Sequence, residues 1–97
     1  MVPLKLGIMD ILHARHILVR HEFEAKDLQR KIAEGKKFEE LAQDFSLCPS
    51  ASRGGDLGQF PRGRMVPAFE KALLKLAPGE VSPPVKTQFG YHLIQRL

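Results

Sequence analysis

Two histidines and one cysteine stand out in this chain, because each lies in a short block that mixes polar or reactive residues with glycines and large hydrophobic residues. A cysteine beside a histidine could act as a nucleophile on a carbonyl group, whereas two adjacent half-buried histidines could satisfy each other's hydrogen bonds. Both chemistries require that distant blocks meet in space. The mixture predicts a lined pocket, and the blocks are ARHIL (14–18), SLCPS (46–50), GGDLGQF (54–60), MVPAFE (65–70) and QFGYHLI (88–94).

In this order and spacing, the five blocks closely resemble the parvulin family of peptidyl-prolyl cis/trans isomerases, and the resemblance runs from about Ile11 to Leu97. It implies rotation of Xaa-Pro peptide bonds. It also implies an α+β domain in which a four-stranded antiparallel sheet is surrounded by about three to four helices, the FKBP-like architecture. The first and last strands would then be central neighbours, so His16 and His92 would form a cross-strand pair.

The resemblance also implies a polar floor made of His16, Cys48, Thr87 and His92. The neutral imidazoles would be linked by hydrogen bonds to each other and to the hydroxyl group of Thr87. The Cys48 thiol could be ionised or could stay neutral within this network. The alternative for the two histidines is a pair that only satisfies its own hydrogen bonds inside a sheet.

Apolar side chains would supply a dry pocket above this floor. Leu57, Met65 and Phe69 match the family positions that hold the proline ring, and Phe60 or Phe89 could close the pocket. Met65 precedes Phe69 by four residues, which places both on one face of a helix. A dry pocket would favour the twisted amide, which is less polar than the planar one. For Phe69 alone, ordinary core packing is the alternative.

Hydrophobic periodicity predicts the elements that would position these residues in the first half of the chain. Residues 11–20 alternate as a strand with two partly apolar faces, which indicates a central strand. A helix is expected over 24–34, ending at Gly35. A second helix is expected over 37–46, and its core stripe would consist of Phe38, Leu41, Ala42 and Phe45.

The second half is expected to supply an edge strand, because Pro83 and Pro84 remove hydrogen-bond donors from the ladder. The whole order indicates helices packed on an antiparallel sheet. The expected elements are a loop over 47–56 that carries Cys48, a short strand over 57–60, a helix from Pro67 to near Ala77, the edge strand over 81–87 and a final strand over 91–97.

Size and charge narrow the class of protein. The 97 residues fit one small domain, with residues 1–10 interpreted as an N-terminal extension or cloning remnant and 11–97 as the folded domain. The fifteen Lys and Arg residues are interleaved with eleven acidic residues, which argues against nucleic acid. No apolar run approaches the roughly 20 residues that a membrane span needs. A single cysteine cannot form an internal disulfide, which favours a reducing compartment, the cytoplasm.

The sequence therefore predicts a monomeric isomerase that acts non-covalently on proline-containing peptides and on unfolded or partly folded proteins, without a cofactor. A zinc site is not expected, because His13 and His16 would face opposite sides of a strand. Arg20 is followed closely by two glutamates and is a poor phosphate clamp, so no phosphate requirement is expected. The alternatives are a non-catalytic proline-peptide-binding or chaperone module and a small thiol hydrolase, which would lack a recognisable oxyanion hole.

Overall fold

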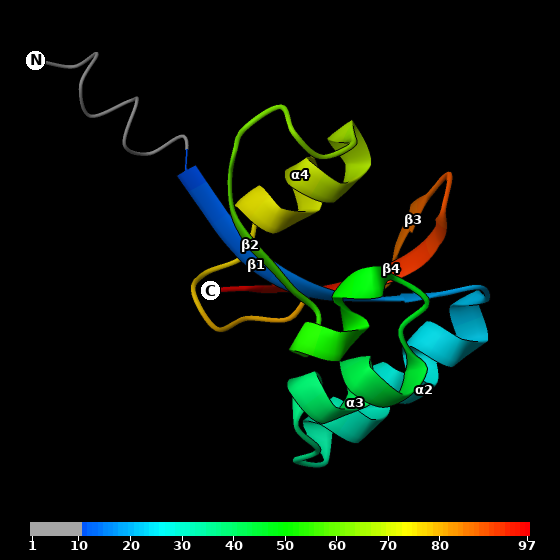
Figure 1. Cartoon of the computed structure of the whole chain (residues 1–97). Coiled ribbons are helices and arrows are strands. Elements are labelled where there is room, and N and C mark those ends of the chain that lie inside the picture. The colour runs from blue at the N-terminus through cyan, green and yellow to red at the C-terminus, as the bar shows by residue number, and fades with distance from the viewer. Residues whose placement is uncertain (1–10) are drawn as a thin grey trace, which may run out of the picture.

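A four-stranded antiparallel sheet runs through the middle of the computed structural model, which describes residues 11–97, and helices cover both of its faces (Figure 1). The strand order is β2-β1-β4-β3, which confirms the predicted α+β class with the first and last strands at the centre. In chain order, the elements are β1 (Ile11–Val19), α2 (Glu22–Ala33), α3 (Phe38–Phe45), the 3₁₀ helix η1 (Pro49–Arg53), β2 (Asp56–Pro61), α4 (Pro67–Leu74), β3 (Val85–Thr87) and β4 (Gly90–Arg96).

The alternation of β1 divides the core into two halves, one on each face of the sheet. Ile17 and Val19 point to the face covered by α2 and α3, whereas Leu12 and Ala14 pack with α4 on the other face. In Figure 1, α2 and α3 accordingly lie below the sheet and α4 above it. The same alternation places His16 on the α4 face, where the functional residues of β4 and α4 also lie.

The first helix begins two residues earlier than expected, at Glu22. The backbone N–H of His21 donates a hydrogen bond to the Glu24 carboxylate over 2.9 Å. Glu24, which we expected to begin the helix, therefore lies in its first turn and caps its N-terminus through its side chain. The prediction for α3 was wrong at one position. Phe45 is the last residue of the helix and is 46% exposed, although its spacing continues the buried stripe.

A bulge in β2 changes the direction of Leu57, one of the predicted pocket residues. His13 pairs with Gln59 but Arg15 pairs with Asp56, so β2 carries one extra residue at this point. The bulge lets Leu57 and Phe60, three residues apart, both face the α4 side of the sheet. Phe60 lies there opposite Leu12 in the core.

Two other segments depart from the expected pattern. The segment over 47–56 is not irregular throughout, because it contains η1. The edge strand is shorter than expected: only Val85–Thr87 forms β3, since Pro83 and Pro84 interrupt it, and Val81 makes an isolated bridge to Gln95. The helix α4 ends at Leu74, a few residues before the expected end.

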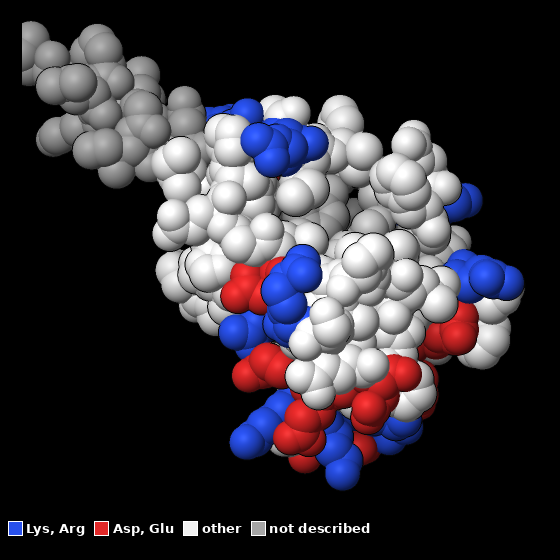
Figure 2. All heavy atoms as spheres, in the orientation of Figure 1, with Lys and Arg blue, Asp and Glu red and all other residues white. Residues whose placement is uncertain are grey.

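Charged side chains gather over α2 and α3, where Lys and Arg are interspersed with Asp and Glu (Figure 2). Arg30, for example, contacts both Asp27 and Glu34, at 2.7 and 2.8 Å. The upper part of the same view is largely uncharged and contains a hollow. Within residues 11–97, no helix combines the length and the apolar character that a membrane span would need.

Candidate functional site

A pocket of about 450 Å³ opens on the α4 face of the sheet, between α4, the loop after α3 and the tip of the β3–β4 hairpin. We call it the central pocket. Its size is within the range of ligand sites, and most of its lining is apolar. The lining residues are His16, Leu18, Leu47, Cys48, Pro49, Leu57, Arg64, Met65, Val66, Phe69, Phe89 and His92.

The structure thus brings together most of the residues that the sequence singled out. Phe60 is an exception: it is 3% exposed, packs in the core and is not part of the pocket lining. Thr87 does not line the pocket either, but it contacts one of the histidines that do. Sequence reasoning missed five lining residues: Leu18, Leu47, Pro49, Arg64 and Val66. Only Leu18 could have been found, because the alternation of side chains along β1 puts it on the same face as His16.

The two histidines form the floor of the central pocket through a direct contact. His16 Nδ1 lies 3.0 Å from His92 Nδ1, and the rings are stacked with centroids 5.2 Å apart. They form the expected cross-strand pair as diagonal neighbours, because His16 pairs with Ile94 and His92 with Leu18. The ring of Phe69 meets both imidazoles edge-on, at 5.6 and 5.4 Å between centroids.

Thr87 completes the network from the neighbouring edge strand. Its hydroxyl oxygen lies 2.7 Å from His92 Nε2 and accepts the backbone N–H of Phe89 at 3.2 Å. By contrast, His16 Nε2 is buried and has no hydrogen-bond partner among the described residues. The chain therefore runs from Thr87 through His92 to His16 and ends at an unpaired nitrogen in the pocket floor.

Two proton arrangements satisfy this chain, and the count of unpaired groups separates them. If His16 donates to His92, the His16 Nε2 lone pair and the Thr87 hydroxyl proton both lack partners. If Thr87 donates to His92 and His92 donates to His16, only the His16 Nε2–H lacks one. Thr87 is only partly buried, so in the first arrangement its proton is left to the solvent, whereas the second pairs it within the network. We infer the second arrangement on that ground. The His16 Nε2–H is then buried beneath the pocket.

Burial keeps both imidazoles neutral at physiological pH. It lowers the pKa of His16 to about 4, and the charge of the neighbouring His92 acts in the same direction. Burial also lowers the pKa of His92 to about 4. A neutral floor beneath apolar walls does not strongly stabilise the dipolar, planar form of a bound amide, so the site can favour the less polar twisted form.

Cys48 lines the central pocket, but its thiol is not hydrogen-bonded to either imidazole. A cysteine nucleophile activated by a histidine would need such a contact. The geometry therefore does not favour thiol hydrolysis. Within the described part of the chain, no cluster of three His, Cys, Asp or Glu side chains could hold a metal ion either.

Backbone contacts hold the walls of the pocket against β1. The N–H of Leu47 donates to the Leu18 carbonyl at 2.8 Å, and the N–H of Leu18 donates to Ser46 Oγ at 3.0 Å. The N–H of His16 donates to the Gly55 carbonyl at 2.9 Å. Gly55 has a φ of +85°, which only glycine adopts at little cost, and this conformation lets its backbone approach β1 closely.

Loss of the Thr87 hydroxyl group should disturb the proton arrangement without removing a histidine. We expect Thr87→Val to lower kcat/KM for an Xaa-Pro peptide about tenfold, equivalent to about 1.4 kcal/mol, because His92 loses the donor that sets its tautomer. Thr87→Ser keeps the hydroxyl group and should retain most activity. The ¹⁵N shifts of the His92 ring should report the tautomer change in the Val variant. Equal rates and unchanged ring shifts in both variants would contradict the assignment.

The sequence profile of the PPIC-type PPIase domain, a rotamase, matches residues 16–97. The chain belongs to the parvulin family. A parvulin of similar size, NmPin of Nitrosopumilus maritimus, is 44% identical, with a TM-score of 0.82, and the match covers 91% of this chain and 96% of that one.

Larger proteins contain the same parvulin domain. The foldase protein PrsA of Bacillus subtilis is 48% identical over 91 residues, which cover 93% of this chain and 31% of that protein. A crystal structure of PrsA from Bacillus anthracis is 46% identical, with a TM-score of 0.88, and the match covers 89% of this chain and 40% of that chain. The parvulin chain thus spans about a third of the length of the curated foldases that it matches first.

Proposed function

We propose that this parvulin catalyses cis/trans isomerisation of Xaa-Pro bonds in unfolded or partly folded proteins and thereby assists their folding. The observation that carries the proposal is the central pocket, in which apolar walls stand over two neutral, mutually hydrogen-bonded histidines. Uncatalysed rotation takes tens to hundreds of seconds, because the amide must lose its resonance. No bond is made or broken, so no nucleophile or cofactor is required.

Each part of the pocket has a role in this proposal. Leu57, Met65 and Phe69 hold the proline ring, and Phe89, which is 60% exposed on the β3–β4 turn, closes over it. The apolar surroundings disfavour the planar amide because it is the more polar form. The neutral pair of His16 and His92 forms the floor beneath the prolyl ring and adds no charge that would stabilise the planar amide.

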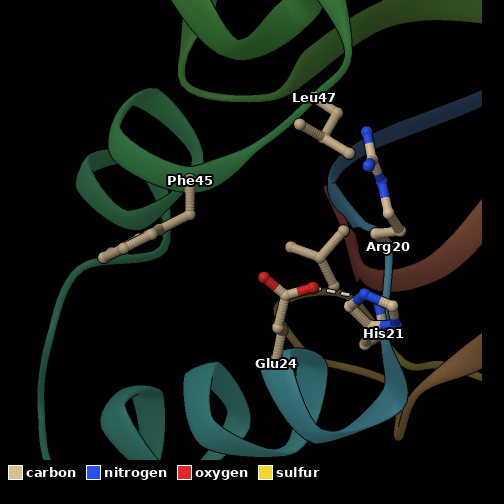
Figure 3. A pocket seen from close by; sticks show the side chains of 6 residues that line it. Arg20, His21, Glu24, Phe45 and Leu47 are labelled. Atoms are coloured by element: carbon tan, nitrogen blue, oxygen red, sulfur yellow. Dashed lines mark hydrogen bonds between the residues drawn. The ribbon is translucent and has the colours of Figure 1, made fainter.

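We further propose that the enzyme does not require a phosphorylated residue before proline. Arg20, which follows β1, lines a smaller cavity next to the central pocket, shown in Figure 3. The same cavity contains the carboxylate of Glu24 and the apolar side chains of Phe45 and Leu47. A phosphate clamp needs several cationic donors, usually paired arginines, and a carboxylate would repel the phosphate.

Exchange NMR on short Xaa-Pro peptides would test both statements, with Leu, Glu or phosphoserine before the proline. We expect catalytic amounts of the protein to accelerate exchange for Leu and Glu, with no additional gain for phosphoserine. Acceleration of the phosphoserine peptide alone would overturn the phosphate statement. Shifted peaks without faster exchange would instead identify the non-catalytic peptide-binding or chaperone module.

Truncation of Met65 would test whether the central pocket is the site of catalysis. We expect Met65→Ala to lower kcat/KM about tenfold, because several methylene and sulfur contacts with the proline ring are lost. Met65→Leu keeps the side-chain volume and should stay within about threefold of the original enzyme. Met65 is only partly buried, so both variants should fold. Unchanged rates in Met65→Ala would remove the assignment of this pocket.

The compartment and the oligomeric state are separate proposals. A single free thiol supports a reducing compartment, as in the cytoplasm, and fractionation of the producing cells would test it. A chain of this size with its own two-sided core is proposed to act as a monomer, which sedimentation would test.

A further inference from the structure

Three large apolar side chains remain exposed where α2 begins and α3 ends. Phe23, in the first turn of α2, is 71% exposed, Phe45 is 46% exposed and Leu47 is 57% exposed. They come from two segments more than twenty residues apart but line two adjoining cavities. Exposed apolar groups gathered at one place are unfavourable in water and commonly mark a binding surface.

The two cavities form one feature, which we call the α2–α3 groove. They measure about 260 and 430 Å³ and share Val19, Glu24 and Phe45 in their walls. Figure 3 shows part of the groove, with Leu47 and Arg20 on one side, Phe45 across from Glu24, and the start of α2 as the lower wall. The first cavity also contains Arg20, His21 and Leu47, and the second contains Phe23, Asp27 and Leu28.

The groove adjoins the central pocket at Leu47. Leu47 lines both the smaller cavity of the groove and the central pocket. On β1, Leu18 lines the central pocket, and its neighbour Val19, which points to the opposite face of the sheet, lines the groove. The backbone is extended at Ser46 and Cys48. Along this segment, Phe45 lines the groove, Leu47 lines both sites and Cys48 lines the central pocket.

The aromatic walls of the groove are held in place without a ligand. The ring of His21 stacks on that of Phe23, with centroids 5.4 Å apart and an angle of 11° between the ring planes. The ammonium group of Lys31 lies 5.0 Å from the centre of the Phe45 ring. These contacts reduce the ordering that a ligand would otherwise have to impose on the rings.

The charges around the groove do not select an ionic ligand. Arg20 and Glu24 line the smaller cavity, and Glu24 and Asp27 line the larger one, so both signs of charge are present. Asp27 is itself paired with Arg30 at 2.7 Å and Lys31 at 3.5 Å. The groove would therefore recognise its ligand by burying an apolar or aromatic side chain.

We propose that the α2–α3 groove binds an apolar side chain of the same client polypeptide whose proline occupies the central pocket. This proposal rests on the proposed function, because the central pocket must hold the client's proline. An extended client advances about 3.3 Å per residue, so a side chain a few residues from the proline can reach an adjoining groove. The enzyme would thus prefer prolines near large apolar residues, which are abundant in unfolded chains and sparse on folded surfaces.

Binding to matched peptides tests the proposal directly. The probes are alanine-rich peptides with one Leu-Pro pair and a single Phe placed two to five residues before or after it, compared with the peptide that lacks Phe. We expect at least one Phe position to lower Kd about tenfold, through the area that the ring buries. The NMR signals of Phe23 and Phe45 should shift only with that peptide.

Substitutions in the groove should remove this gain. For each variant, Phe23→Ser and Phe45→Ser, we compare the Kd of the peptide that lacks Phe with the Kd of the peptide that contains it. The ratio of the first Kd to the second should fall from about ten to about one or two. Ile11→Ser is the matched control, because Ile11 is also exposed, at 52%, but lines neither site. Its ratio should remain that of the original protein.

The outcomes separate this proposal from the proposed function. Equal Kd values for all Phe positions, with isomerisation still accelerated, would overturn the groove and leave the isomerase intact. Absence of acceleration for every peptide would overturn the isomerase, whereas the Kd ratio would still report on the groove. Dimerisation that is lost in Phe23→Ser would overturn the proposal by making a second copy of the chain the occupant.

Discussion

Gly55→Ala is expected to destabilise this protein by about 3 kcal/mol or more, a large share of the stability of a small domain. A β-carbon at this position would overlap the carbonyl oxygen of His16, and the backbone φ of +85° already disfavours any other residue. Relief of the overlap requires β1 and the η1–β2 connection to separate, which would also break the hydrogen bond from the His16 N–H to the Gly55 carbonyl. Urea denaturation followed by circular dichroism would measure the loss.

Gly58→Ala is the matched control for this substitution. Gly58 also has a positive φ, of +72°, but a β-carbon there would meet no atom within 4 Å. It should cost only the conformational penalty, about 1 to 2 kcal/mol. The difference between the two variants isolates the close approach at His16. If both variants lost the same stability, the contact between Gly55 and β1 would not be important.

Mild acid is expected to destabilise the protein well above the pH at which carboxylates titrate. Burial lowers the pKa of both His16 and His92 from 6.5 to about 4, so in this range the unfolded chain binds protons that the folded protein does not. Their contribution to stability is complete above pH 6.5 and is lost as the pH falls toward 4. The slope is about 1.4 kcal/mol per pH unit for each buried histidine.

Urea denaturation at several pH values between 4.5 and 6.5 would measure this slope. Hydrogen bonds lower the pKa values of Asp27, Glu39 and Asp56 from ordinary values of 3.8 to 4.5, so these carboxylates contribute below this window. His92→Gln should reduce the slope by about half, because one titrating group is removed. A slope that is the same in this variant, or absent in the original protein, would contradict burial of the neutral pair.

The part of the fold that depends on periodicity could be predicted from the sequence. The alternation in β1 correctly indicated a strand with two buried faces, because a central strand must satisfy both halves of the core. The contact between His16 and His92 depended on the family resemblance rather than on periodicity. Whether these residues perform catalysis stays a prediction for the experiments above to test.

The errors concern side chains whose burial depends on neighbouring elements, which a local sequence pattern does not determine. Phe45 continues a helical stripe, but α3 ends there and the groove beyond it is not filled by other residues. Phe60 was expected beside the pocket, but its place opposite Leu12 puts it in the core. The β2 bulge, which lets Leu57 face the same side as Phe60, inserts one residue, and no period-two pattern can reveal such an insertion.

The pairing of β1 with β4 also has a consequence for how this protein folds during its synthesis. His16 and His92 are separated by 76 positions in the sequence, and the centre of the sheet joins residues near both ends of the described chain. Contacts between such distant residues form slowly, because a long loop must close first. On a ribosome, the first histidine would leave the exit tunnel long before its partner. The floor of the central pocket therefore cannot exist until both ends of the domain have been made, so the proposed isomerase activity would not be available to the molecule's own X-Pro bonds while its chain is being synthesised.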